Sequence, residues 1–130
     1  MTQEDKNILL KDLCARLPYG VIADCVGERI KIKYVDPNIG MAYISNYNAA
    51  TKWESIEVIK PYLRPMSSMT EEEDKEWQYY KNAIVESCDE KLEYKIGALY
   101  NWFNSHHFDY RGLIPMGLAL ESKEGMYKID

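Results

Sequence analysis

The sequence predicts an α+β protein in which helices flank an antiparallel sheet. Between residues 21 and 59, apolar and polar residues alternate, which is the period of strands with one buried face. On both sides of that region, apolar residues recur every three or four positions, which is the period of helices. A chain of 130 residues is long enough for a single domain with one hydrophobic core.

The first predicted element is a helix that ends before residue 18. Thr2 is a suitable N-cap, and the acidic residues after it favour the positive end of a helix. Pro18 and Gly20 then stop the helix. Its apolar stripe comprises Leu9, Leu13 and Leu17, with Leu10 and Cys14 beside it.

Four strands follow, and the second is the clearest. Between residues 28 and 34, Ile30 and Ile32 alternate with Arg29, Lys31 and Lys33. Short turns separate the strands, so the natural assembly is an antiparallel meander, and it can also curl into a small SH3-like barrel. The predicted strands are residues 21–26, 28–34, 41–45 and 53–59. The proline-bracketed residues 61–65 suit an extended crossing segment.

The region 66–120 is predicted to be helical. Thr70 and Glu73 form a capping box, which explains the acidic run that begins at Glu71. The apolar phase runs unbroken from residue 77 to 103, so it fits either one helix over 70–106 or two helices with a break near 88–91. We favour two helices, because exposed apolar stripes are rare on monomers. A single protruding helix would instead favour a homodimer.

The remaining segments complete the predicted domain. Residues 118–120 form a short apolar patch that we expect to dock on the core, and residues 121–130 form a polar tail. The domain is therefore organised as a helix plus β-meander (1–65), a helical part (66–120) and the tail.

Composition limits the compartment and the class of function. Three scattered cysteines, Cys14, Cys25 and Cys88, form no zinc motif, and we expect them to be buried in a reducing environment. The polar start does not resemble a signal peptide, and no apolar run is long enough for a membrane span. We therefore expect a cytoplasmic protein, whose 11 tyrosines suit half-buried sheets and interfaces.

Charge argues against nucleic-acid binding as the main function. The net charge is −5, and it is uneven: residues 1–65 carry nine basic against eight acidic residues, and residues 66–130 carry seven against thirteen. Binding to phosphates needs a basic patch, and the sequence contains no basic run. The face that carries Arg29, Lys31 and Lys33 is the one place where a weak local patch is expected.

Residues 104–114 hold the densest group of titratable and aromatic side chains, including both histidines. Adjacent histidines do not share a metal as an i, i+4 pair does, so we expect no metal and no cofactor. The segment matches no catalytic motif and no nucleophile signature accompanies it, so we assign no catalytic residue. The candidate binding residues are His106, His107, Asp109, Tyr110 and Arg111.

Three functional interpretations remain open. The first is a non-enzymatic module that binds an unknown protein through a tyrosine-rich surface containing the candidate residues. The second is a small hydrolase or transferase that uses a His/Asp pair, with His106 or His107 beside Asp109. The third is a weak nucleic-acid binder that uses Arg29, Lys31 and Lys33.

Four segments of the chain belong together as markers: LKDLCARLPYGV at residues 10–21, KPYLRPMSSMT at 60–70, NWFNSHHFDYRGLI at 101–114 and GLALE at 117–121. Together they resemble an uncharacterised family of small proteins from gut Bacteroidetes and their prophages. The resemblance implies an accessory protein of a phage or mobile element in a bacterial cytoplasm, and it implies no activity. It covers about a third of the chain.

Overall fold

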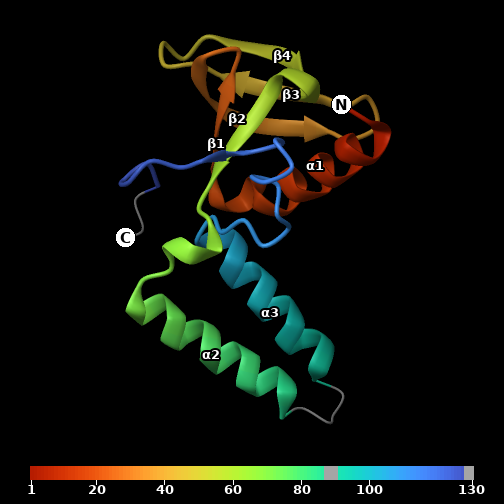
Figure 1. Ribbon diagram of the computed structural model, residues 1–130. Helices are drawn as coiled ribbons and strands as arrows, with labels where there is room; N and C mark the ends of the chain where they lie inside the picture. Colours follow the sequence, from red (N-terminus) through yellow and green to blue (C-terminus); the bar gives the residue numbers. More distant parts are fainter. Residues whose placement is uncertain (87–90, 128–130) are drawn as a thin grey trace.

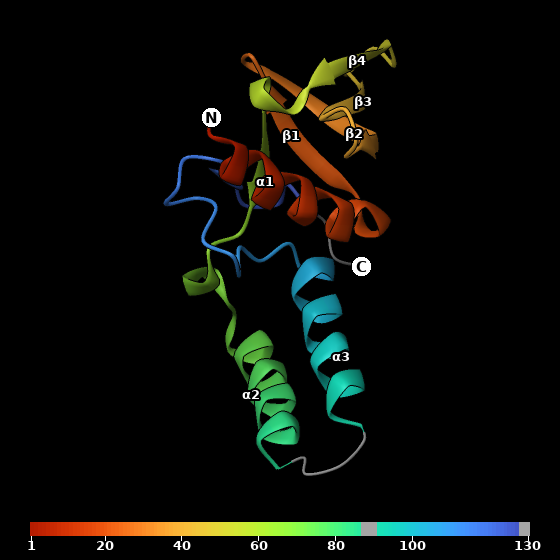
Figure 2. The same cartoon turned by 90° about the vertical axis from the view of Figure 1, so that its right-hand side faces the viewer.

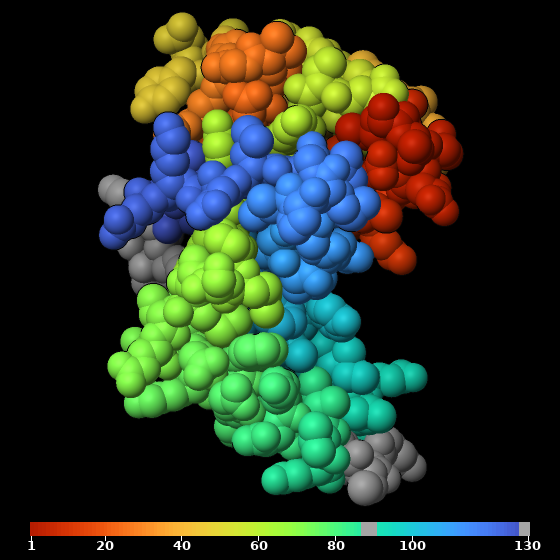
Figure 3. Space-filling view, in the orientation of Figure 1, coloured from red at the N-terminus to blue at the C-terminus, as the bar shows by residue number. Residues whose placement is uncertain are grey.

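The computed structural model describes residues 1–86 and 91–127, and it confirms the α+β class. Helix α1 (Gln3–Arg16) packs on one face of a sheet. The sheet and α1 form one end of the molecule, and a two-helix hairpin forms the other end (Figure 1). The segment after the hairpin lies between the two parts (Figure 3). No helix in the described part of the chain combines the length and apolar character needed to span a bilayer.

Helix α1 begins as predicted and buries most of its predicted stripe, but it also buries Asp12 and Arg16 and leaves Cys14 exposed. Thr2 and Asp5 form a capping box at its start. Leu9 and Leu13 are fully buried against the sheet. The expectation that Cys14 is buried is wrong, because this side of the helix faces solvent, whereas Cys25 is buried and Cys88 lies outside the described residues.

The predicted meander is present. Four strands pair antiparallel with their chain neighbours: β1 (Val21–Cys25), β2 (Glu28–Asp36), β3 (Met41–Ser45) and β4 (Thr51–Ser55). The β1–β2 loop contains only Val26 and Gly27, and both have positive φ, at 50° and 84°. These angles match the twist of a tight hairpin, which explains the glycine.

The fourth strand and the segment after it differ from the prediction. The strand ends at Ser55, and a turn of 3-10 helix over Ile56–Val58 follows, with the Ser55 hydroxyl accepting the Glu57 N–H. The predicted crossing segment is instead a strand, β5 (Ile59–Leu63), antiparallel to β1 and parallel to β6 (Leu120–Glu121). The six strands form an open sheet in the order β4-β3-β2-β1-β5-β6, with no barrel closure among the residues described.

A proline in β5 explains why the sequence pattern does not indicate a strand here and why the pairing of β5 is irregular. Pro61 has no N–H to donate, and its pairing with Ala23 is the last between β1 and β5. Beyond it, the Tyr127 hydroxyl bridges the two strands by accepting the Ile22 N–H at 3.0 Å and donating to the Tyr62 carbonyl at 2.8 Å. Burial raises the pKa of Tyr127 to about 12, so the hydroxyl stays protonated.

The hairpin confirms two helices in place of one. Helices α2 (Glu71–Val85) and α3 (Leu92–Ser105) lie side by side and extend away from the sheet (Figure 2). The predicted break at 88–91 falls largely outside the described residues. A second apolar cluster forms where the hairpin meets the sheet; its buried members are Trp102, Phe103 and Phe108.

Arg64, just after β5, connects the hairpin to the sheet. Its guanidinium holds Glu73 in a bidentate pair at 2.7 and 2.8 Å and lies over the Phe108 ring at 4.3 Å. This pair, together with the cap contacts from Thr70, lowers the pKa of Glu73 to about 2. The Arg64 backbone also bonds to the residues on both sides of Phe108. Its N–H donates to the His107 carbonyl, and its carbonyl accepts the Asp109 N–H.

Removing the Tyr127 hydroxyl tests its role as a bridge between β1 and β5. We expect Tyr127→Phe to lower the free energy of unfolding by about 1–2 kcal/mol, because the Ile22 N–H loses its partner while the ring is retained. Urea denaturation measures this loss. Tyr79→Phe, at an exposed tyrosine of α2, is the control and should change stability little; equal losses in both variants would contradict the bridging role.

Candidate functional site

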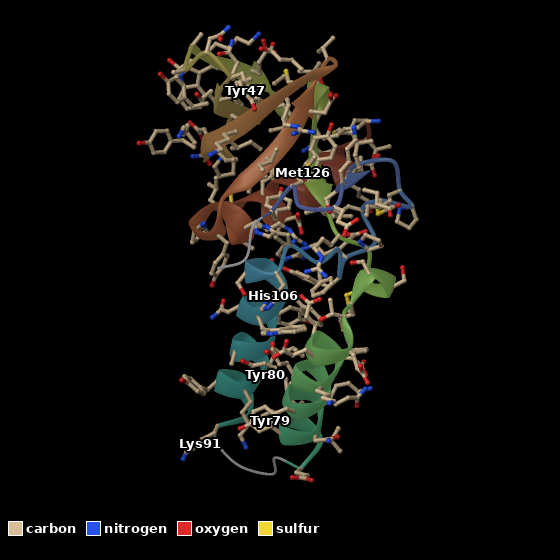
Figure 4. All side chains as sticks on the ribbon, turned by 90° about the vertical axis from the view of Figure 1, so that its left-hand side faces the viewer. Tyr47, Tyr79, Tyr80, Lys91, His106 and Met126 are labelled. Carbon is tan, nitrogen blue, oxygen red and sulfur yellow. The ribbon has the colours of Figure 1, made fainter. Side chains whose placement is uncertain are left out.

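The predicted cluster around the two histidines lies at the junction between the sheet and the hairpin. His106 is at the base of α3, at the level where the hairpin meets the sheet body (Figure 4). His107 and Asp109 are buried, and His106, Tyr110 and Arg111 are partly exposed. The structure therefore brings these residues together but gives a ligand access to only some of them.

Asp109 organises the chain reversal after α3. One carboxylate oxygen accepts the Leu113 N–H at 2.8 Å, and the other accepts the Ile114 N–H at 2.9 Å. Both oxygens thus satisfy backbone donors in a buried turn, as a capping residue does. The geometry gives Asp109 a structural task.

His107 is a buried, neutral side chain. Its φ is +63°, its exposed fraction is 6%, and its ring stacks on Tyr127 with centroids 3.6 Å apart. Burial, reinforced by the nearby charges of Arg16, Arg64 and His106, lowers the pKa of His107 to about 4. At neutral pH the ring is therefore uncharged and holds the C-terminal segment through Tyr127.

His106 contacts its own helix and the neighbouring one. Its Nδ1 lies 2.9 Å from the Trp102 carbonyl, and its Nε2 is 4.0 Å from a carboxylate oxygen of Glu76. Glu76 also accepts the Trp102 indole N–H at 2.7 Å, which joins α2 to α3. The ring thus caps the end of α3, where a histidine is favourable.

Tyr110 and Arg111 belong to a network that the sequence analysis missed. Arg111 donates to Asp12 at 3.1 Å, and Asp12 also holds Arg16 through bonds of 2.8 and 3.1 Å. Arg16 and Arg111 both lie over the Tyr110 ring, each 5.1 Å from its centroid. The sequence does contain a signal of this network, because Asp12 and Arg16 lie three and seven positions after Leu9, which is the spacing of the buried face of α1.

This geometry does not assemble a catalytic pair. Among the described residues, neither histidine hydrogen-bonds to Asp109, and no three or more His, Cys, Asp and Glu side chains are grouped to hold a metal. The use of the cluster as a binding surface stays a prediction, and His106, Tyr110 and Arg111 are its accessible members.

A second candidate site lies on the face of the sheet opposite α1. Strand β2 directs Ile30 and Ile32 into the core, so Arg29, Lys31 and Lys33 lie on the outer face. All three cations line one surface hollow of about 540 Å³. The other residues around it, among those that the structure describes, are uncharged: Ile22, Ile30, Ser45, Asn46, Tyr47, Ala49 and Met126.

The hollow is formed by segments far apart in the sequence. Tyr47 extends from the β3–β4 loop with an exposed fraction of 89%, and Met126 arrives from the C-terminal segment. Figure 4 shows both residues on the sheet body, well away from Tyr79 and Tyr80 on the hairpin. Tyr127, the residue after Met126, stacks on His107 and accepts the Ile22 N–H, so the junction holds one wall of the hollow in place.

An aromatic row continues this face across three strands. Tyr34, Tyr43 and Trp53 stand side by side, with centroids 6.0 Å and then 5.2 Å apart. A bulge in β2 between Ile32 and Tyr34 sets Lys33 and Tyr34 opposite Tyr43. The cationic line of β2 therefore ends at the first ring of the row.

The outer face is more basic than the chain as a whole. By strand register, Lys60 also lies on this face. Asp24 lies between Lys60 and Arg29 as the partner of both, and Asp36 lies at the end of β2. In the described part of the chain, neither Lys31 nor Lys33 takes part in an ion pair. The sequence indicated the cations, but not Tyr47, Met126 or the aromatic row, whose positions depend on strand pairing and a long-range contact.

No family model, curated protein or solved structure matches this chain.

The structural task of Asp109 predicts a large effect on stability. We expect Asp109→Ala to lower the free energy of unfolding by about 3 kcal/mol, because the buried Leu113 N–H and the partly buried Ile114 N–H lose a charged acceptor. Chemical denaturation measures the loss, and Asp109→Asn, which keeps one acceptor, should lose less. An unchanged melting temperature for Asp109→Ala would return this residue to the candidate binding surface.

The buried histidine predicts a pH dependence of stability. The pKa of His107 is about 4 when folded and near its ordinary 6.5 when unfolded, so the unfolded chain binds more protons between these values. The free energy of unfolding should then fall by about 2 kcal/mol between about pH 7 and about pH 5.

Urea denaturation at the two pH values, repeated on His107→Asn, checks this prediction. Asparagine tolerates the positive φ of this position and does not titrate. The variant should be less stable at neutral pH, because it lacks the stacked ring, but its stability should vary less over this interval. A pH dependence as steep as that of the wild type would mean that other groups are responsible.

Proposed function

We propose that this protein is a non-enzymatic binding module whose outer sheet face takes an extended polyanionic ligand. The observation that carries the proposal is the convergence of Arg29, Lys31 and Lys33 on one hollow that no carboxylate of residues 1–86 or 91–127 lines. Phosphate- or sulfate-bearing chains are attracted to such a patch, and the attraction weakens as salt screens it.

The surrounding charges favour a local site over general adhesion to anions. The chain carries a net charge of −5, so a polyanion is repelled by most of the molecule and attracted at this face. Arg29 is placed by its contact with the Tyr62 ring, 5.9 Å from the centroid, whereas Lys31 and Lys33 extend into solvent. The inner face of the sheet packs against α1, and the outer face is the one that we assign to the ligand.

Retention on immobilised heparin tests the proposal, because heparin supplies an extended polyanion without nucleobases. We expect the wild type to bind at low salt and Lys31→Glu/Lys33→Glu to flow through, because reversing both charges makes the hollow repulsive. The matched control is Lys11→Glu/Lys75→Glu, which changes the net charge equally at exposed positions of α1 and α2. Wild-type protein that is not retained, or equal losses in both variants, would contradict the proposal.

A further inference from the structure

We propose that the polyanion is a single-stranded nucleic acid, whose phosphates occupy the basic hollow while its bases stack on the row formed by Tyr34, Tyr43 and Trp53. This inference rests on the proposed function and adds to it the class of ligand. Its basis is the juxtaposition of Lys31 and Lys33, which form no ion pair within residues 1–86 and 91–127, with accessible rings on the same face.

The cations are spaced to follow an extended chain. Alternate residues of a strand lie about 7 Å apart on one face, so Arg29, Lys31 and Lys33 form a line along β2. The bulge brings Tyr34 onto the same side, directly after Lys33. A backbone that follows this line therefore carries its bases to the aromatic row.

The rings are available for stacking. Tyr34 and Trp53 have exposed fractions of 65% and 48%, which is unusual for large aromatic side chains that serve only a core. Tyr43 is held between them, and its hydroxyl donates to Thr51 at 2.7 Å, which fixes the centre of the row. Tyr47, which lines the hollow, adds a further exposed ring.

A single strand fits this face better than a duplex or an acidic protein. Stacked bases in a duplex hide the surfaces that aromatic rings recognise, whereas the bases of a single strand are free to stack. An acidic peptide would pair with the cations but would leave the aromatic row without a partner of matching chemistry. Nucleobases supply flat surfaces at every step of the chain, and sequence matters little to stacking.

Fluorescence anisotropy with labelled oligomers of about twelve residues tests the inference, since single-strand sites cover about this length or less. The probes are oligo(dT), an abasic oligomer with the same phosphates, the oligo(dT)·oligo(dA) duplex and poly-glutamate. We expect oligo(dT) to bind at least about tenfold more tightly than the abasic oligomer. Oligo(U) of the same length shows whether the sugar of RNA or of DNA is preferred.

Variants of the row separate stacking from charge. Tyr34→Ala and Trp53→Ala should each weaken oligo(dT) binding about tenfold and leave retention on heparin unchanged. Tyr79→Ala, at an exposed tyrosine on the hairpin, is the matched control and should bind as the wild type does. Oligo(dT) should also quench wild-type tryptophan fluorescence, and Trp53→Phe should bind oligo(dT) while losing most of the quenching.

The outcomes distinguish the two proposals. Equal affinity for oligo(dT) and the abasic oligomer would overturn the nucleic-acid inference and leave the polyanion site standing. Tighter binding of poly-glutamate would replace the nucleic acid with an acidic protein, and tighter binding of the duplex would exclude recognition by stacking. Failure to bind heparin and every oligomer would overturn both proposals.

Discussion

The buried ion pair between Asp12 and Arg16 is the constraint on which the rest of the structure depends. Arg16 is fully buried, and a buried charge is tolerated only when its partners are in place. Asp12 accepts two bonds from it, and the Phe108 carbonyl accepts another at 2.6 Å. These bonds tie α1 to the junction, so the helix that covers the sheet also fixes the base of the hairpin.

The same ion pair explains how Tyr110, Arg111 and His107 are arranged in the cluster around the two histidines. Arg111 shares Asp12, Tyr110 lies beside both arginines, and the charge of Arg16 helps to keep His107 neutral. A dense group of titratable and aromatic side chains suggests an active site in a sequence. Here most of the density has a structural cause, because the junction of two apolar clusters must satisfy many polar groups in a small space.

Local patterns in the sequence were sufficient for the elements that short-range chemistry determines. The capping box at Thr70, the alternation in β2 and the two-helix hairpin could all be predicted. Strand β5 could not, because Pro61 breaks the pattern of a central strand and the partner β6 is distant in the sequence. The cations of the candidate site were also visible in the sequence, but the hollow requires the register of β2 with β3 and the return of the chain at Met126.

The late position of β6 has a consequence for the order in which the chain folds. Residues of α1 and the first four strands are close in sequence and can assemble soon after synthesis. The end of β5 is different, since Tyr62 and Leu63 find their partners only at Leu120 and Glu121, and Tyr127 fills the gap beside Ile22. On the ribosome, the end of β5 lacks these partners until the hairpin has emerged and residues 120–127 have followed it. The sheet is therefore completed as one of the last events of folding.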